Sequence, residues 1–103
     1  MTSIPITRGT DLLFAVQLAA AGFDILTCGW RVEFIVGGLT VATVDNTDAV
    51  VEDGTCYVSA DTSGWPSGGL YWRATAYIPD ARMADGIRTE TATEYSGYNI
   101  VQP

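Results

Sequence analysis

The chain has 103 residues, of which 48% are hydrophobic and 17% are charged, and it contains neither histidine nor lysine. This length fits one domain over residues 1–103, and the apolar fraction is too high for a disordered chain. Twelve acidic residues against five arginines give a formal net charge of −7. That charge disfavours nucleic acid and anionic membrane surfaces as partners. Without His and Lys the commonest general base, the commonest metal ligand and the Schiff-base amine are missing, so composition disfavours most enzyme classes.

The first apolar run covers residues 12–23 and is too short for a membrane-spanning helix, which needs about 20 apolar residues. A signal peptide and an ordinary helix are competing interpretations. Asp11 beside the run and the single Arg8 before it disfavour a signal peptide. Apolar residues recur at every second position, which favours a strand. Leu12, Phe14, Val16 and Leu18 would share one face of this strand, and Asp11, Leu13, Ala15 and Gln17 the other.

Alternation with a period of two continues along the chain and predicts further half-buried strands. These cover residues 30–36, 39–44, 55–60, 70–78, 87–95 and 98–101. Gly37-Gly38 predicts a two-residue hairpin turn, because both positions tolerate positive φ. Gly97 is expected to separate the last two strands, and Pro5 suits a first strand at an edge. About seven short strands and no convincing helix predict an all-β fold, an antiparallel β-sandwich.

The two cysteines, Cys28 and Cys56, allow two interpretations. They would form one disulfide if their strands faced each other across the core. Two cysteines do not make the dense disulfide framework of a small secreted protein. We therefore favour two buried thiols in a reducing cytoplasm.

The acidic segment 45–48, together with Glu52 and Asp53, has oxygen ligands of the kind that Ca²⁺ takes, but its spacing is not that of an EF-hand loop. Polar turns have the same composition without metal. The acidic residues are scattered over turns, and no pair of carboxylates or activated Cys or Ser stands out. We expect no catalytic residues, no metal site and no cofactor, and hence not an enzyme.

Aromatic residues are the strongest candidates for a binding surface. Trp30 and Trp72 fall in inward registers and are expected in the core. Three tyrosines fall in outward registers, and one tryptophan lies in a loop before the fifth strand. An interface patch and ordinary cross-strand pairing on a solvated sheet face both explain them. The candidate interface residues are Tyr57, Trp65, Tyr71 and Tyr77.

Three segments carry a resemblance to a known family. Residues 6–11 read Ile-Thr-Arg-Gly-Thr-Asp, residues 25–32 read Ile-Leu-Thr-Cys-Gly-Trp-Arg-Val, and residues 65–73 read Trp-Pro-Ser-Gly-Gly-Leu-Tyr-Trp-Arg. With the strands between them, they resemble the N-terminal Ig-like domain of phage baseplate upper proteins and related phage tail and fibre proteins. The resemblance covers most of the chain.

This resemblance implies an Ig-like β-sandwich that is a structural or adaptor component of a phage virion, assembled in the host cytoplasm. The implied partners are other virion proteins and further copies of the chain in a homo-oligomer, with no nucleic acid or membrane. The competing function is a secreted carbohydrate-binding or adhesin-like module that uses Trp65 and the outward tyrosines.

Overall fold

A computed structural model of the protein describes residues 3–103 as eight strands without a helix. Within those residues, therefore, no helix is long and apolar enough to cross a membrane. The strands are β1 (Ile4–Thr7), β2 (Asp11–Val16), β3 (Gly29–Val36), β4 (Leu39–Asp45), β5 (Val50–Glu52), β6 (Thr55–Asp61), β7 (Gly68–Pro79) and β8 (Ile87–Val101).

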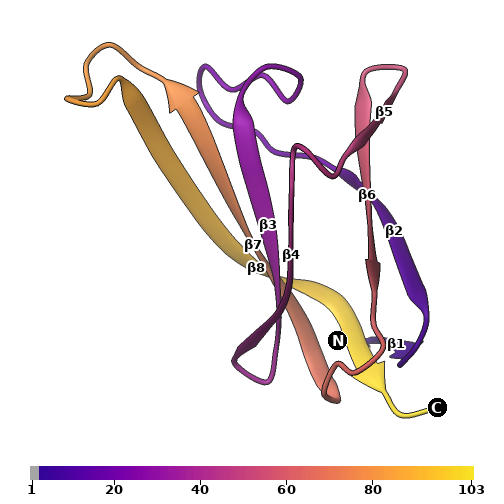
Figure 1. The fold of residues 1–103 in the computed structure, drawn as a ribbon. Coiled ribbons are helices and arrows are strands. Elements are labelled where there is room, and N and C mark those ends of the chain that lie inside the picture. Colours follow the sequence, from indigo (N-terminus) through magenta and orange to yellow (C-terminus); the bar gives the residue numbers. More distant parts are fainter. Residues whose placement is uncertain (1–2) are drawn as a thin grey trace.

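The strands form two sheets that pack face to face, with the orders β1-β8-β7-β3-β4 and β2-β6-β5. Figure 1 shows the sheets close together at the end that carries both termini and further apart at the other end. The predicted β-sandwich is confirmed. All pairings are antiparallel apart from that of β1, which runs parallel to the last residues of β8.

The strand orders are those of an immunoglobulin-like sandwich. In such domains strands B, E and D form part of one sheet, and G, F, C and C′ form the other. Here β2, β6 and β5 take the B-E-D positions, while β8, β7, β3 and β4 take the G-F-C-C′ positions. In a constant-type domain strand A lies beside B. No strand among residues 3–103 occupies that place, because β1 pairs with β8 instead.

Most of the predicted strands are confirmed. The residues from 12 to 18 form β2 and the extended segment after it, with Leu12, Phe14, Val16 and Leu18 more buried than their neighbours. The Gly37-Gly38 turn connects β3 to β4, with φ of 61° and 80°. Such a turn fits the right-handed twist of a hairpin.

Two details of the strand prediction were wrong. β5 was missed, because its three residues are all exposed and have no alternation of burial. Gly97 does not end a strand: β8 runs through it without interruption. Its φ of 86° is accessible to glycine without strain, so the chain can change its register against β7 and continue.

The core lies between the sheets and is centred on Phe34, whose side chain is fully buried. Its ring meets that of Phe14 on the opposite sheet edge to face, with centroids 5.2 Å apart. Trp65 and Trp72 pack against the same ring at 5.6 and 6.4 Å. Edge-to-face and tilted arrangements of this kind are favoured between aromatic rings. Trp30 is 1% exposed and is a core residue, as predicted.

The turn between β1 and β2 is held by Thr62, a fully buried residue just after β6. Its hydroxyl donates a 2.7 Å hydrogen bond to the carbonyl oxygen of Thr10 and accepts a 2.9 Å hydrogen bond from the backbone amide of Gly9. This pair of bonds anchors the point where the chain leaves β1 on one sheet and enters β2 on the other.

Candidate functional site

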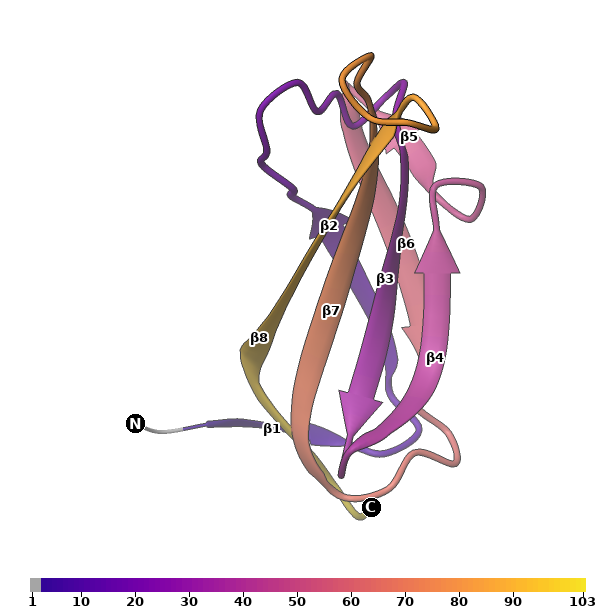
Figure 2. The same cartoon turned by 90° about the vertical axis from the view of Figure 1, so that its left-hand side faces the viewer.

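The five-stranded sheet, of which Figure 2 shows the strands β8, β7, β3 and β4 side by side, carries two of the four candidate interface residues on its outer face. These are Tyr71 and Tyr77 of β7. Tyr71 lies opposite Tyr95 of β8, and the two rings are 5.2 Å apart at an angle of 49°. Tyr95 donates a 2.8 Å hydrogen bond from its hydroxyl to Asn99 Oδ1. Tyr95 was not among the predicted residues. It continues the outward alternation of Thr89, Thr91 and Thr93, and that pattern is the signal that would have found it.

The other candidate residues do not join this pair. Tyr77 lies six residues further along β7, about 20 Å away at the usual rise of a strand, and its ring covers the backbone of Gly29. Tyr57 lies on β6 in the other sheet, where it faces outward opposite Ala15 and Val50. The predicted tyrosine patch is therefore split between two opposite faces of the sandwich.

Trp65 lies in the loop before β7, as predicted, but its assignment to an interface patch is wrong. Its side chain is 4% exposed and packs against Phe34. The loop after β6 folds back over the end of the core, because the Trp65 amide bonds to the carbonyl of Thr62 and so forms a tight turn. A buried indole cannot serve as a flat platform for a sugar ring.

Between Tyr71 and Tyr77 the outer face is occupied by an ion pair. Arg73 binds both carboxylate oxygens of Glu33 on the neighbouring strand, at 2.7 and 3.1 Å. The hydrogen bond from Arg73 lowers the pKa of Glu33, and the positive charge of the guanidinium adds to the effect. Arg31 lies 3.6 Å from the same carboxylate. These paired charges stabilise the sheet. The carboxylate of Glu33 is held by both arginines and is not free to act as a general base.

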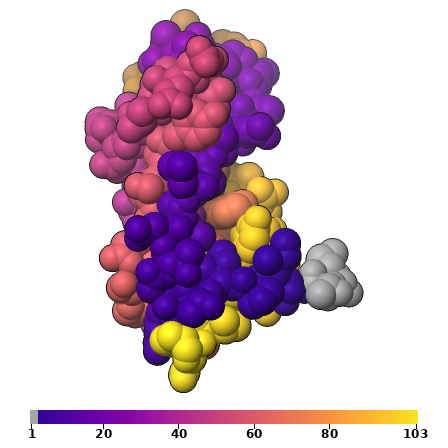
Figure 3. Space-filling view, turned by 90° about the vertical axis from the view of Figure 1, so that its right-hand side faces the viewer, coloured from indigo at the N-terminus to yellow at the C-terminus, as the bar shows by residue number. Residues whose placement is uncertain are grey.

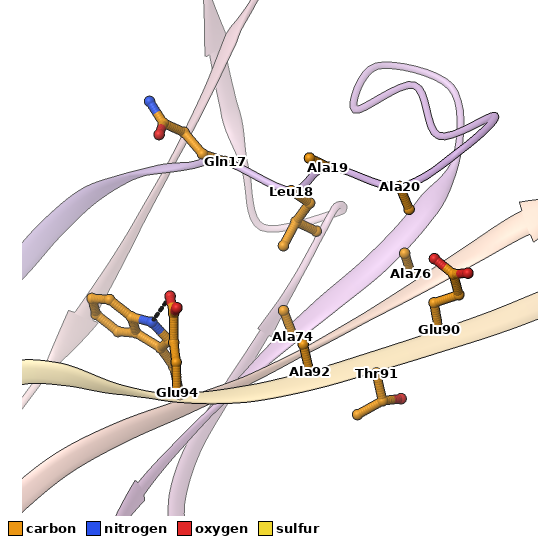
Figure 4. Close-up of a pocket in the computed structure, with 11 residues that line it drawn as sticks. Gln17, Leu18, Ala19, Ala20, Ala74, Ala76, Glu90, Thr91, Ala92 and Glu94 are labelled. Atoms are coloured by element: carbon orange, nitrogen blue, oxygen red, sulfur yellow. Dashed lines mark hydrogen bonds between the residues drawn. The ribbon is translucent and has the colours of Figure 1, made fainter.

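A groove opens on one side of the sandwich, where β2 at the edge of the three-stranded sheet faces β8 near the edge of the five-stranded sheet. It lies between the segment Gln17–Ala20 and the inner faces of β7 and β8, and it has a volume of about 510 Å³ (Figure 4). A second hollow of about 230 Å³ continues it past Phe14 and Val32 toward the core. We call the two together the open-side groove. Figure 3 looks onto the three-stranded sheet and shows the yellow of β8 beyond the edge of indigo β2.

The open-side groove exists because the side chains along its floor are small. Its floor consists of Ala74 and Ala76 from β7 and Ala92 from β8. On the inner face of the sheet, Trp72 of β7 pairs with Glu94 of β8, and Ala76 pairs with Glu90. A sandwich core of usual packing has larger apolar residues at such positions. The alternation of residues 70–78 placed Ala74 and Ala76 on the same face as Trp72. It could not show that this part of the face has no strand opposite it.

The open-side groove is acidic. Glu90 and Glu94 line it together with apolar side chains and the amide of Gln17, and no cationic side chain is among the lining residues. Trp72 Nε1 donates a 2.9 Å hydrogen bond to Glu94 Oε1. Arg88 precedes Glu90 on the same face of β8, but its guanidinium is directed to Asp80 Oδ2, 2.8 Å away, and to the carbonyl oxygen of Ala21. Its remaining contact with Glu90 is 3.4 Å.

The acidic turn that resembled a calcium loop is held by its own hydrogen bonds. Asp45 Oδ1 accepts bonds from the amide and hydroxyl of Thr47, and these lower the pKa of Asp45. Asp48 accepts a bond from the amide of Asp45. Within residues 3–103 no three acidic or cysteine side chains converge on a point where a metal ion would bind. Cys28 and Cys56 are buried free thiols, as favoured from the sequence.

No family model, curated protein or solved structure matches this chain. The resemblance to phage baseplate and tail proteins therefore stays a prediction, and the function rests on the residues. Among the unpaired sheet edges in the described part of the chain, those of β2 and β8 flank a groove, and the outer face of the larger sheet is polar. These features are suited to binding another polypeptide.

Proposed function

We propose that the protein is a non-enzymatic assembly module that acts by docking to other proteins, and that it is a structural or adaptor component of a phage virion. One observation carries the assembly part. Within the described residues, β2 and the first eleven residues of β8, 87–97, are unpaired edges on the same side of the sandwich, beside a groove. Unpaired edges present free N–H and C=O groups, which another polypeptide can bind by adding a strand.

The location in a virion is supported by the sequence resemblance. We also propose that the chain forms a closed homo-oligomer, since structural virion components follow closed symmetry. The acidic surface supports the same function, because it limits nonspecific contact with the genome and with the bacterial surface, both of which carry negative charge.

The carbohydrate-binding alternative is less well supported, because it relied on Trp65 and this residue is buried. On the outer face of the five-stranded sheet, Tyr71 and Tyr95 are the exposed aromatic residues among those that the structure describes, and they form a tilted pair. Such a module would show quenching of tryptophan or tyrosine fluorescence on titration with glycans.

The proposed function is tested by light scattering of the purified protein over a range of concentrations. We expect a closed oligomer, such as a trimer or a hexamer, with a mass independent of concentration above its dissociation constant. A monomer at every concentration, combined with saturable glycan binding, would contradict the proposal and support the alternative.

A further inference from the structure

We propose that the open-side groove is the docking site for an extended, basic segment of another protein, which pairs with the free edge of β2 and directs lysine or arginine side chains toward Glu90 and Glu94. This inference rests on the proposed assembly function and names the chemistry of the partner. It follows from three observations: which edge is unprotected, what the groove would contact, and which charges line it.

The two edges beside the groove differ in how they are protected. Proteins guard exposed edges with proline, lysine or inward-pointing charges, and β8 has inward-pointing charges at Arg88, Glu90 and Glu94. β2 has none of these along its length from Leu12 to Val16, and Leu13 on its outer face is 73% exposed. By this comparison β2 is the edge that accepts a further strand.

A strand added beside β2 would fill the place that strand A occupies in an immunoglobulin constant domain. Its inward side chains would enter the second hollow, which Phe14, Val16 and Leu18 line from one sheet and Trp72 and Ala74 from the other. Phe14 and Trp72 already stack at 5.9 Å across this gap. Apolar side chains of the partner would bury the partly exposed surface of these residues, which is the main driving force for such association.

The charges of the groove decide the class of partner. Glu90 and Glu94 face the space that the added strand would enter. Arg88 approaches Glu90 at 3.4 Å, but no cationic side chain lines the groove itself. Glu90 and Glu94 lie four residues apart on β8, about 13 Å at the usual rise of a strand, so one lysine or arginine on the added strand would meet one of the two carboxylates. In a two-fold dimer along β2, each copy would contribute the same surface and bring a second pair of glutamates to this groove. Like charges at close range in a partly desolvated site are unfavourable. The partner is therefore a basic segment of another chain.

The test uses a capped heptapeptide with the order lysine, threonine, valine, threonine, leucine, threonine, lysine. Every second residue would face the groove, and a lysine at each end allows either strand direction. The matched control peptide has glutamate in place of both lysines. Binding to the full ¹⁵N-labelled chain is followed by NMR, using the backbone amides of β2 and the indole N–H of Trp72, which reports on Glu94.

We expect the basic peptide to shift the β2 amide resonances and the Trp72 indole resonance, and to bind at least about fivefold more tightly than the acidic peptide. The double variant E90Q/E94Q should reduce this preference to less than about twofold. The variant E52Q/D53N removes the same number of charges at the β5–β6 turn and should keep the preference, since that turn is far from the groove in the sheet order.

Equal binding of the two peptides, shifts confined to β8 or β5, or no shift at millimolar peptide would overturn this proposal. A concentration-dependent dimer in which the β2 amides are already protected from exchange would also overturn it, because a second copy would then occupy the edge. None of these results bears on an oligomer formed through another face. The solution mass therefore tests the assembly function separately from the strand-docking inference.

Discussion

Trp72 and Glu94 lie directly opposite each other on β7 and β8 and are joined by a 2.9 Å hydrogen bond from the indole Nε1 to a carboxylate oxygen. The bond connects an aromatic residue that packs against the core to a charged residue at the mouth of the open-side groove. It orients the carboxylate and gives the indole N–H a partner at a position that is only half buried. A ligand that binds Glu94 would therefore be detected at Trp72.

We predict that W72F destabilises the protein by about 0.5–1.5 kcal/mol, the usual net value of one intramolecular hydrogen bond. Phenylalanine keeps the stacking with Phe14 but removes the N–H donor. The free energy of unfolding is measured by urea denaturation. E94Q is the control, because its amide oxygen still accepts the bond, and we expect a smaller loss. A W72F protein as stable as the parent would show that the bond contributes nothing to stability.

Thr62 should be important for stability despite being a polar loop residue. The substitution T62V keeps the shape but removes the hydroxyl that bonds to both Gly9 and Thr10. Leaving a buried donor and acceptor unpaired costs about 1–3 kcal/mol, and we expect a loss of that size in urea unfolding. T62S, which retains the hydroxyl, should lose less. If T62S were the more destabilised of the two variants, the methyl group rather than the hydrogen bonds would be the stabilising part.

Acid should destabilise the protein partly through Asp80. The side chain of this residue is 7% exposed. Hydrogen bonds from Arg82, followed by the positive charge of Arg82 and a hydrogen bond from Arg88, hold its pKa well below the usual range. Because the pKa in the folded state is lower than in the unfolded state, the resulting stabilisation is fully present above about pH 4. It is lost as the pH falls below that value, where the unfolded chain binds the proton first.

The variant D80N tests this pH dependence. We expect its unfolding free energy to fall less between pH 6 and pH 3 than that of the parent, although its stability at pH 6 is lower because Arg82 and Arg88 lose their partner. D85N is a suitable control in the same turn, since no salt bridge involves Asp85 in the described structure. Parallel pH profiles for D80N and the parent would contradict the assignment.

Both cysteines should react slowly with a thiol reagent in the folded protein, because Cys28 is 7% and Cys56 3% exposed. After unfolding without a reductant, two thiols per chain should react at once. A non-reduced, denatured sample that contains no reactive thiol would show that the two residues had formed a disulfide.

The local pattern of the sequence was a good guide to the strands. In β3 every second residue is large and apolar, so burial on one face gives a clear alternation. In β7 every second residue from Leu70 to Ile78 is apolar as well, although Ala74 and Ala76 are small. The pattern fails where a strand is buried on neither face, as in β5, and where a glycine with positive φ allows a strand to continue, as at Gly97. The parallel pairing of β1 depends on a contact with residues more than 90 positions away, and alternation carries no information about it.

The candidate site was harder to predict, because it depends on the order of strands in the sheets. Tyr57 and Tyr71 have the same outward pattern, yet they face opposite sides of the molecule. Trp65 lies in a segment of turn-forming residues, and only the fold shows that this turn closes over Phe34. The groove likewise exists because no strand among residues 3–103 covers the inner face of β8, and the residues of β8 do not reveal this.

The proposed docking depends most directly on the free edge of β2, and hydrogen exchange of the dilute, purified protein shows whether this edge is free. In an antiparallel strand that pairs on one side only, every second amide lacks a partner. We predict that alternate amides of Asp11–Val16 exchange quickly, that the others are protected by β6, and that the basic heptapeptide slows the fast set. Protection of the whole of β2 in the free protein, or a fast set that the peptide leaves unchanged, would contradict docking at this edge.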